Sequence, residues 1–393
     1  MKIATIKKLF LILISLIFVL YIIARIFGPE LLDRKFNSVI ASAPYVVSDE
    51  ASAMYHSFDF VSDMHSDLLL WDRDILNRHD YAQQDIPRNI EANMALQFFT
   101  LFNKVPAGLN FDKNPSDSDQ VTPIMILQGR PISTWFDLTE RVIHLSQTLH
   151  QYAKDSNGKL FVIESKKDLK DYIVKRKSNK NITAGLLGIE GAQALKGDIK
   201  NLQRVYDAGV RMIGLTHFFD NEVGGSAHGV DKAGITSFGK QLIPEMEKLH
   251  VLIDISHASP KLIDDVLAIA TKPIIVSHTG VKGTCDNVRN LSDDHLIKIA
   301  KTGGIIGIAV FEHAVCGTTA KAIANAIKYT VDLVGAKHVA LGSDFEGAIT
   351  AIFEVSGLPL VVQELLAMEM SEEDIRLVMG DNVKRILLEN LPD

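Results

Sequence analysis

The chain has 393 residues, of which 47% are hydrophobic and 23% charged, as in an ordinary globular protein. Lys and Arg total 41 against 48 Asp and Glu, so the formal net charge is −7, and no dense basic block occurs. Nucleic-acid binding proteins carry clustered basic residues, so we expect no nucleic-acid partner. The only two cysteines are Cys285 and Cys316. We predict no disulfide framework and expect both to be buried small side chains.

The N-terminus predicts a membrane-spanning helix. Residues 9–27 are apolar apart from Ser15 and Arg25, and about 20 apolar residues suffice to cross a bilayer. We therefore expect residues 1–27 to be a cytoplasmic tip and a transmembrane signal anchor. A cleaved signal peptide is the alternative, with the small residues 41–43 as a candidate cleavage site.

Basic residues before the apolar run predict the orientation of this anchor. They are Lys2, Lys7 and Lys8. By the positive-inside tendency, the short leading end stays in the cytoplasm. The main body is then expected outside the cytoplasm, which in a bacterium is the periplasmic side of the inner membrane.

Beyond a connector over residues 28–57, the region 58–393 predicts a single α/β barrel. Short apolar runs alternate with amphipathic helical patterns such as 236–249, 259–270 and 319–334. The runs occupy residues 58–65, 92–102, 183–191, 210–217, 250–258, 273–279, 303–310 and 338–345. Such runs are typical of parallel strands covered on both faces. Eight of them alternating with helices favour a closed (β/α)8 TIM-type barrel, with an open doubly wound sheet as the alternative.

Two segments depart from this simple alternation. Residues 103–182 are too many for one crossover. They begin with a polar stretch, 110–120, that predicts a surface loop, and continue with helical periodicity over 134–154. We identify no chemistry in this segment. Near the end of the chain, Ser371 followed by three acidic residues predicts the start of a helix.

The predicted strands share one feature, because six of the eight finish on His, Asp or Glu. The residues at these ends are Asp63, His65, Asp67, Glu190, His217, His257, His278 and Asp344. The carboxyl ends of barrel strands meet on one face, where active sites lie. Imidazole and carboxylate together suit Zn²⁺. Any one of these residues could have a structural role, but their joint placement predicts a metal site. The alternating Asp63, His65 and Asp67 could share a metal on one strand face.

The remaining histidines carry weaker information. Most of the following are expected at the surface: His56, His79, His144, His150, His250, His295 and His338. His228 and His313 follow strands on the catalytic side, and their place is left open.

Several motifs resemble those of the membrane (renal) dipeptidase family. They are SDMHSDLLL, LLGIEGA, LTHFFDNEVGGSAHG, LIDISHAS, IIVSHTG followed by NVRN, ALGSDFEG and GDNVKRIL. They run in order from about residue 58 to 390, and the extension through Gly229 is similar to bacterial members. The resemblance implies an amidohydrolase-like (β/α)8 metal hydrolase with two zinc ions.

Residue roles follow from the same resemblance. It implies that His65, Asp67 and Glu190 hold one zinc ion, and that Glu190 bridges to a second. The second ion would be completed by His257 and His278. Asp344 would transfer a proton beside a metal-bridging hydroxide, His217 would contact the scissile carbonyl oxygen, and Arg289 would bind the terminal carboxylate of the substrate. Phe102 stands where the family has an aromatic hydroxyl, so that contact is not expected here.

We therefore expect a membrane-anchored dizinc dipeptidase with dipeptides as substrates. A metal-dependent amidohydrolase acting on another small amide, lactam or ester is the first alternative. A non-catalytic membrane-tethered barrel that only binds its partner is the second. An apolar helix face could also serve a homodimer.

Overall fold

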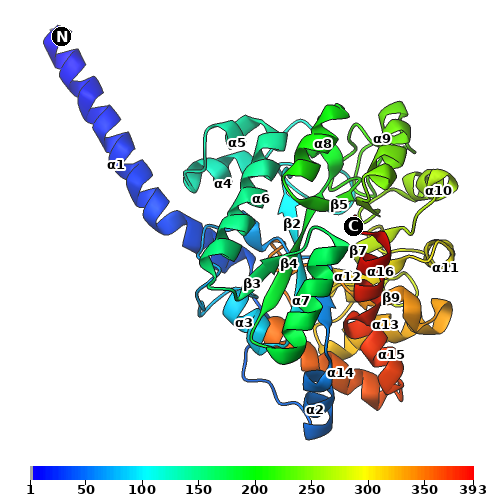
Figure 1. Cartoon of the computed structure of the whole chain (residues 1–393). Helices are drawn as coiled ribbons and strands as arrows, with labels where there is room; N and C mark the ends of the chain where they lie inside the picture. The colour runs from blue at the N-terminus through cyan, green and yellow to red at the C-terminus, as the bar shows by residue number, and fades with distance from the viewer. Residues whose placement is uncertain (1–2) are drawn as a thin grey trace.

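The body of the protein is a nearly closed parallel barrel, as the computed structural model of residues 3–393 shows (Figure 1). Its strands are, in spatial order, β1 (Val61–Asp63), β2 (Met94–Phe102), β4 (Thr183–Glu190), β5 (Val210–Gly214), β6 (Leu252–Asp254), β7 (Ile275–Thr279), β8 (Ile305–Ile308) and β9 (Val339–Leu341). The ring closes where the Met64 amide donates to the Leu341 carbonyl at 3.0 Å. The predicted barrel is confirmed, and the open sheet is excluded.

Helices surround these strands. They are α2 (Asp49–Ser57), α3 (Ile86–Glu91), α4 (Val121–Leu127), α5 (Ser133–Phe136), α6 (Leu138–Asp155), α7 (Lys166–Ser178), α8 (Lys200–Asp207), α9 (Ser237–Lys248), α10 (Pro260–Ile269), α11 (Asp293–Lys301), α12 (Glu312–Val315), α13 (Ala320–Val334), α14 (Leu358–Ala367), α15 (Glu372–Arg376) and α16 (Asn382–Asn390). The three amphipathic patterns that we predicted correspond to α9, α10 and α13. Ser371 caps α15 as expected, because its side chain accepts from the Asp374 amide.

The continuous apolar runs form strands because both faces of each strand are buried. Successive residues alternate between two apolar clusters, so that Leu186 packs inside the barrel and Leu187 under the helices. Likewise, Ile305 packs inside the barrel and Ile306 packs under the helices. A strand that projects side chains to both sides needs apolar residues at every position here. This packing holds the strand ends, and the side chains on them, in a fixed frame.

The segment 103–182 contains one strand that we did not predict. β3 (Leu160–Val162) pairs with the first residues of β4, Thr183 to Gly185, off the barrel path. β5 pairs with β4 only from Leu187 onward, which leaves that edge open to β3. Residues 110–120 form a loop as expected, and the helical pattern of 134–154 is α5 and α6, with Asp137 as the cap of α6.

The N-terminal helix α1 (Ile3–Phe36) projects from the body (Figure 1). Its part from Ile6 to Phe36 is long and apolar enough to cross a membrane. The helix does not end with the apolar run at residue 27, but continues through Pro29 to Phe36. Part of the expected connector is therefore helical and contacts the body.

The two cysteines correct our expectation, because Cys285 and Cys316 form a disulfide. They lie on the loops after β7 and β8, with their Cα atoms 5.3 Å apart. Separations of about 4.4–6.8 Å permit a disulfide. Neighbouring strands of a barrel bring these loops together, although 31 residues separate the cysteines in sequence.

Candidate metal centre

The structure brings the strand-end residues of the prediction together at the carboxyl face of the barrel. His65 and Asp67 follow β1, Glu190 ends β4, and His278 lies in β7. The other three follow their strands directly: His217 after β5, His257 after β6 and Asp344 after β9. All seven side chains are buried, with at most 8% of any of these residues exposed.

Glu190 occupies the middle of this cluster. Its Oε1 lies 3.4 Å from Nε2 of His65, 3.3 Å from Nε2 of His257 and 3.5 Å from Nε2 of His278. Its Oε2 lies 3.3 Å from Nε2 of His217. One carboxylate therefore faces four imidazoles, which places it where a ligand shared by two ions would have to be.

A second group of donors surrounds His65. Its Nε2 lies 3.7 Å from Oδ2 of Asp67 and 3.8 Å from Oδ1 of Asp344. The cluster thus has three overlapping groups of donors: His65, Glu190 and His278; Glu190, His217 and His257; and His65, Asp67 and Asp344. Glu190 belongs to the first two groups, and His65 links the third to them.

The donor set fits zinc or a similar divalent ion. Nε2 of His65, Oδ2 of Asp67 and Oε2 of Glu190 are buried without a hydrogen-bond partner among the described residues. Nε2 of His257 and Nε2 of His278 face one another at 2.9 Å. In a tetrahedral site with bonds of about 2.0–2.1 Å, donor atoms lie about 3.3 Å apart. The spacings within the cluster are close to this value.

Neighbouring polar groups orient these donors. Ser277 Oγ lies 2.9 Å from Nδ1 of His65 and donates to Oδ2 of Asp254 at 2.6 Å. Thr100 donates to Oδ1 of Asp67 at 2.6 Å. Such outer contacts hold a histidine so that its other nitrogen faces the ion. We did not identify Ser277, Asp254 or Thr100 from the sequence, because lone hydroxyl and carboxyl residues inside strands are common.

Asp63 does not join the cluster, which corrects the interpretation of the alternating Asp63, His65 and Asp67. Its Oδ1 accepts from the Ser343 amide at 2.6 Å, and its Oδ2 accepts from Gln97 at 2.8 Å. The barrel closes between β1 and β9 at this point, so the side chain ties Ser343 in place. Asp63 thereby supports the loop that carries Asp344.

The loop after β9 is held in an unusual backbone conformation. Asp344 has φ +66°, Glu346 φ +64° and Ala348 φ +57°. His257, another cluster residue, has φ +62°. Residues other than glycine pay strain in this left-handed region, of order 1–3 kcal/mol each, and such residues concentrate at functional sites.

Burial and neighbouring charges shift the pKa values of the residues in the cluster. Burial raises the pKa of Glu190 to about 7, with a further contribution from the charge of Asp67. Burial also raises the pKa of the Asp344 carboxyl well above its usual range. For His65, burial lowers the pKa, but the charges of Glu190 and Asp67 outweigh it and the net shift is well upward. Burial lowers the pKa of His257 and of His278 well below the usual range, so both imidazoles are neutral.

Metal affinity should therefore fall as the pH drops through neutrality. Below its pKa of about 7, Glu190 binds a proton that an ion must displace, and the proton on His65 must leave as well. Each displaced proton weakens binding by about tenfold per pH unit below the pKa concerned. Competition with a chromophoric chelator between pH 6 and 8 measures this dependence. Affinity that stays constant after correction for the chelator would contradict it.

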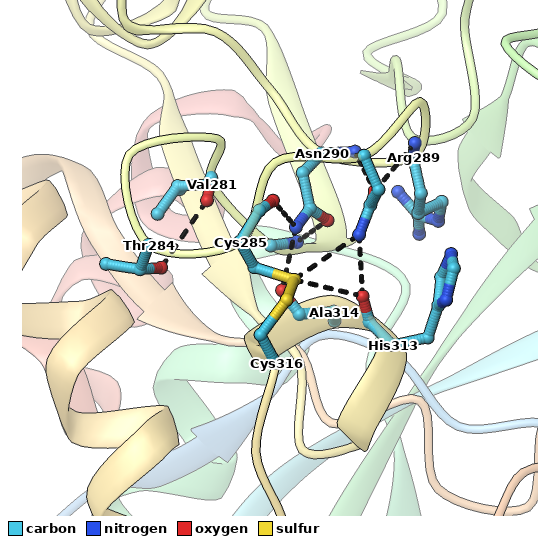
Figure 2. The surroundings of a disulfide bond; sticks show 10 residues. Val281, Thr284, Cys285, Arg289, Asn290, His313, Ala314 and Cys316 are labelled. Atoms are coloured by element: carbon cyan, nitrogen blue, oxygen red, sulfur yellow. Dashed lines mark hydrogen bonds between the residues drawn. A yellow bond between two sulfur atoms is a disulfide. The ribbon is translucent and has the colours of Figure 1, made fainter.

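Arg289 reaches the site from the loop that the disulfide holds. Its Nη2 donates to the His278 carbonyl at 2.8 Å, and the residue is 4% exposed. Figure 2 shows Cys285 and Cys316 beneath this loop, with Asn290 donating to the Cys285 carbonyl at 2.7 Å and to the Ala314 carbonyl at 2.8 Å. The bridge and these hydrogen bonds join the loops after β7 and β8, and so fix the base from which Arg289 extends.

Aromatic rings cover the side of the cluster that contains His217. Phe102 lies 5.0 Å from His217 between ring centroids, and Phe111 stacks on His313 at 3.7 Å. Phe111 also accepts a hydrogen bond through its carbonyl from Nδ1 of His228 at 2.7 Å. His228 and His313 therefore border the site. Phe111 shows that the loop 110–120 reaches it too, which no sequence pattern indicated.

The other histidines depart from the expectation of a mainly surface position. Two of the seven are exposed, His56 and His250, whereas four are half-buried: His79, His144, His150 and His338. His295 is buried, and its Nε2 lies 3.6 Å from Asp264.

Comparison with known proteins gives consistent results. The family model of membrane dipeptidases (peptidase family M19) matches residues 49–391. Dipeptidase aclJ of Aspergillus oryzae is 27% identical over 362 residues, which cover 83% of this chain and 77% of that protein. Dipeptidase 3 of Mus musculus is 28% identical over 231 residues, which cover 53% of this chain and 45% of that protein.

Solved structures support the fold. A metallopeptidase from Rhodobacter sphaeroides, crystallised with a phosphinate mimic of the dipeptide L-Ala-D-Ala, superimposes with a TM-score of 0.69. The match covers 85% of this chain and 100% of that one at 22% sequence identity.

Proposed function

The chain belongs to the membrane dipeptidase family, peptidase family M19, and we propose that it is a dizinc enzyme that hydrolyses the peptide bond of dipeptides. The observation that carries this proposal is the meeting of buried histidines and carboxylates around Glu190. His65, Asp67 and Glu190 would hold one ion, and Glu190, His257 and His278 the other. When bound, the two ions would supply Lewis acidity, which polarises the scissile carbonyl and lowers the pKa of the attacking water.

Asp344 is the proton-transfer group in this proposal. Its carboxyl lies 3.8 Å from His65 at the edge of the donor cluster. Burial raises its pKa, so it can hold a proton near neutral pH. It would accept a proton from the attacking water and deliver it to the leaving amine, as a positioned acid and base does.

His217 would stabilise the negative charge that develops on the carbonyl oxygen. Its Nε2 lies 3.3 Å from Oε2 of Glu190 and its Nδ1 lies 3.4 Å from the Lys104 carbonyl, so each ring nitrogen faces an acceptor. The proposed role uses the tautomer with the proton on Nε2. Burial lowers the pKa of His217 well below the usual range, so the imidazole is neutral. A neutral donor held in place beside the reacting carbonyl is a typical oxyanion contact.

Arg289 would select substrates with a free terminal carboxylate. A guanidinium group matches a carboxylate in bidentate geometry. The substitution Arg289→Ala should lower kcat/KM for dipeptides by about 30- to 5,000-fold, because a buried charge pair of this kind is worth about 2–5 kcal/mol when one partner is truncated. Dipeptide amides, which lack that carboxylate, should be hydrolysed equally by both forms.

A panel of dipeptides, dipeptide amides, tripeptides and small cyclic amides tests the substrate class. Arg78→Ala is the matched control, because Arg78 pairs with Glu91 at the surface. Preference of the native chain for dipeptides, lost only in Arg289→Ala, supports the proposal. Equal turnover of the amides and cyclic amides by the native chain would favour the broader amidohydrolase function instead.

The names of the relatives point to the same chemistry. Two of them are called dipeptidases, and the Rhodobacter sphaeroides structure holds a dipeptide mimic. On this basis we place a short peptide at the carboxyl face of the barrel, between Glu190 and Arg289.

We also propose that α1 anchors the barrel to a membrane with the catalytic body outside the cytoplasm. The apolar run of α1 and the lysines ahead of that run support the anchor and its direction. The disulfide between Cys285 and Cys316 is a second argument, because disulfides persist in oxidising compartments.

A further inference from the structure

The second half of α1 is packed against the body and is not a free tether. Tyr21 donates through its hydroxyl to the Ile126 carbonyl of α4 at 3.1 Å. One turn later Arg25 lies against Gly129, where an added Cβ would meet Nη1 of Arg25 at 1.4 Å. Tyr21 and Arg25 are four positions apart, so they lie on one face of the helix.

The end of α1 is fixed by buried charges. Asp33, 1% exposed, forms an ion pair with Arg73. Arg73 also pairs with Glu346 at 2.6 Å, and Trp71 donates to the Glu346 carbonyl at 2.8 Å. Breaking one member of such a buried pair is strongly destabilising. The helix therefore has one defined orientation on the carboxyl face of the barrel.

The opposite face of the same stretch is open, and it is apolar apart from Glu30, which pairs with Arg34 at 2.7 Å. Ile26 is 64% exposed, Phe27 60% and Leu31 65%. These side chains continue the apolar surface of the preceding turns of α1. A membrane that surrounds those turns would therefore extend along the helix to about Leu31. At this level the inner face of α1 is already packed on α4. Residues near α4 therefore lie at the same depth as the end of the membrane-spanning segment.

The segment 121–136, which comprises α4, α5 and their connection, has the composition of a membrane-interface element. It contains one charged residue, Arg130, and no acidic residue. Ile132 is 72% exposed and Phe136 79% exposed. Figure 1 shows α4 and α5 on the side of the body from which α1 projects. Exposed aromatic and aliphatic side chains with a basic residue are typical of surfaces that enter the interface of a bilayer.

We propose that segment 121–136 is a second membrane contact, which inserts Ile132 and Phe136 into the lipid interface beside the anchor helix. The proposal rests on the membrane anchoring proposed above, and its partner is the lipid bilayer. The segment is joined to the site, because Val121 and Met125 share an apolar cluster with Phe102, the residue that packs on His217. The contact would hold the catalytic face close to the membrane surface.

Site-directed fluorescence tests this contact in the full chain. The two native cysteines are paired, so a single introduced cysteine is the only free thiol. Ile132→Cys and Phe136→Cys report on the proposed contact, and Leu13→Cys reports on the anchor. Val174→Cys on α7 is the matched control, because Val174 is also apolar and is 68% exposed. Each variant carries an environment-sensitive fluorophore and is reconstituted into phosphatidylcholine–phosphatidylglycerol vesicles with and without brominated lipid.

The expected result is that brominated lipid reduces the emission at positions 13, 132 and 136 and leaves position 174 unchanged. Quenching at position 13 without quenching at 132 and 136 would overturn the second contact while the anchor stands. The absence of quenching at position 13 would overturn the anchoring and the contact with it. Blue-shifted emission at 132 and 136 that brominated lipid does not quench would assign the surface to a second copy of the chain, and would also overturn the proposal.

Discussion

The substitution Glu190→Gln is expected to lower dipeptide kcat/KM by about 10³-fold or more, since losing several kcal/mol of transition-state charge stabilisation has this effect. Glutamine keeps the shape of the side chain but removes the negative charge that faces the imidazoles of His65, His257 and His278. The variant should also purify with less metal. Steady-state kinetics together with elemental analysis of the purified protein measure both effects.

Glu91→Gln is the control for this substitution, because Glu91 lies at the surface and pairs only with Arg78 in the described chain. It should behave as the native chain in both measurements. A Glu190→Gln variant with normal turnover and normal metal content would show that this carboxylate is not a shared ligand.

Asp344→Asn is expected to lower kcat by about 10²–10⁴-fold, the range for loss of a positioned acid and base. Asparagine is the substitution of choice, because it tolerates the left-handed backbone that Asp344 adopts at φ +66°. The fold and metal content should therefore be preserved. The pH profile of kcat should also lose the change in rate that the titration of the Asp344 carboxyl causes.

Metal content separates the two roles that Asp344 could have. Its Oδ1 lies close enough to His65 and Asp67 to belong to a three-residue donor group. Loss of metal together with activity would make Asp344 a ligand, whereas loss of activity with metal retained would support proton transfer. Asp171→Asn, at a surface ion pair with Lys167, is the control.

The barrel and the cluster could be predicted because a short stretch of sequence is enough to identify each strand. A parallel strand covered on both faces is a continuous apolar run, and the polar residue at its end is easily recognised. Since parallel strands in a barrel all end on one face, Glu190, His257 and His278 could be placed together without any knowledge of their contacts. The exact role of each residue could not be obtained in this way, as Asp63 demonstrates.

Other features depend on contacts that the sequence pattern does not encode. The Cys285–Cys316 bridge requires two loops to meet, and Phe111 approaches the site from an irregular loop. The three-residue strand β3 is too short for a periodic pattern to indicate it. The docking of α1 through Asp33 and Arg73 was also missed, because an acidic residue after an apolar run is equally typical of a connector.

Metal titration of the chelated protein shows whether hydrolysis of dipeptides needs two zinc ions. The purified full chain is stripped of metal, and dipeptide hydrolysis is followed as zinc is added back in known equivalents, with Glu190→Gln alongside. We predict no activity in the stripped chain, full recovery at two equivalents per chain, and no recovery in the variant. Hydrolysis that persists in the stripped chain, or that is complete at one equivalent, would contradict a two-metal dipeptidase.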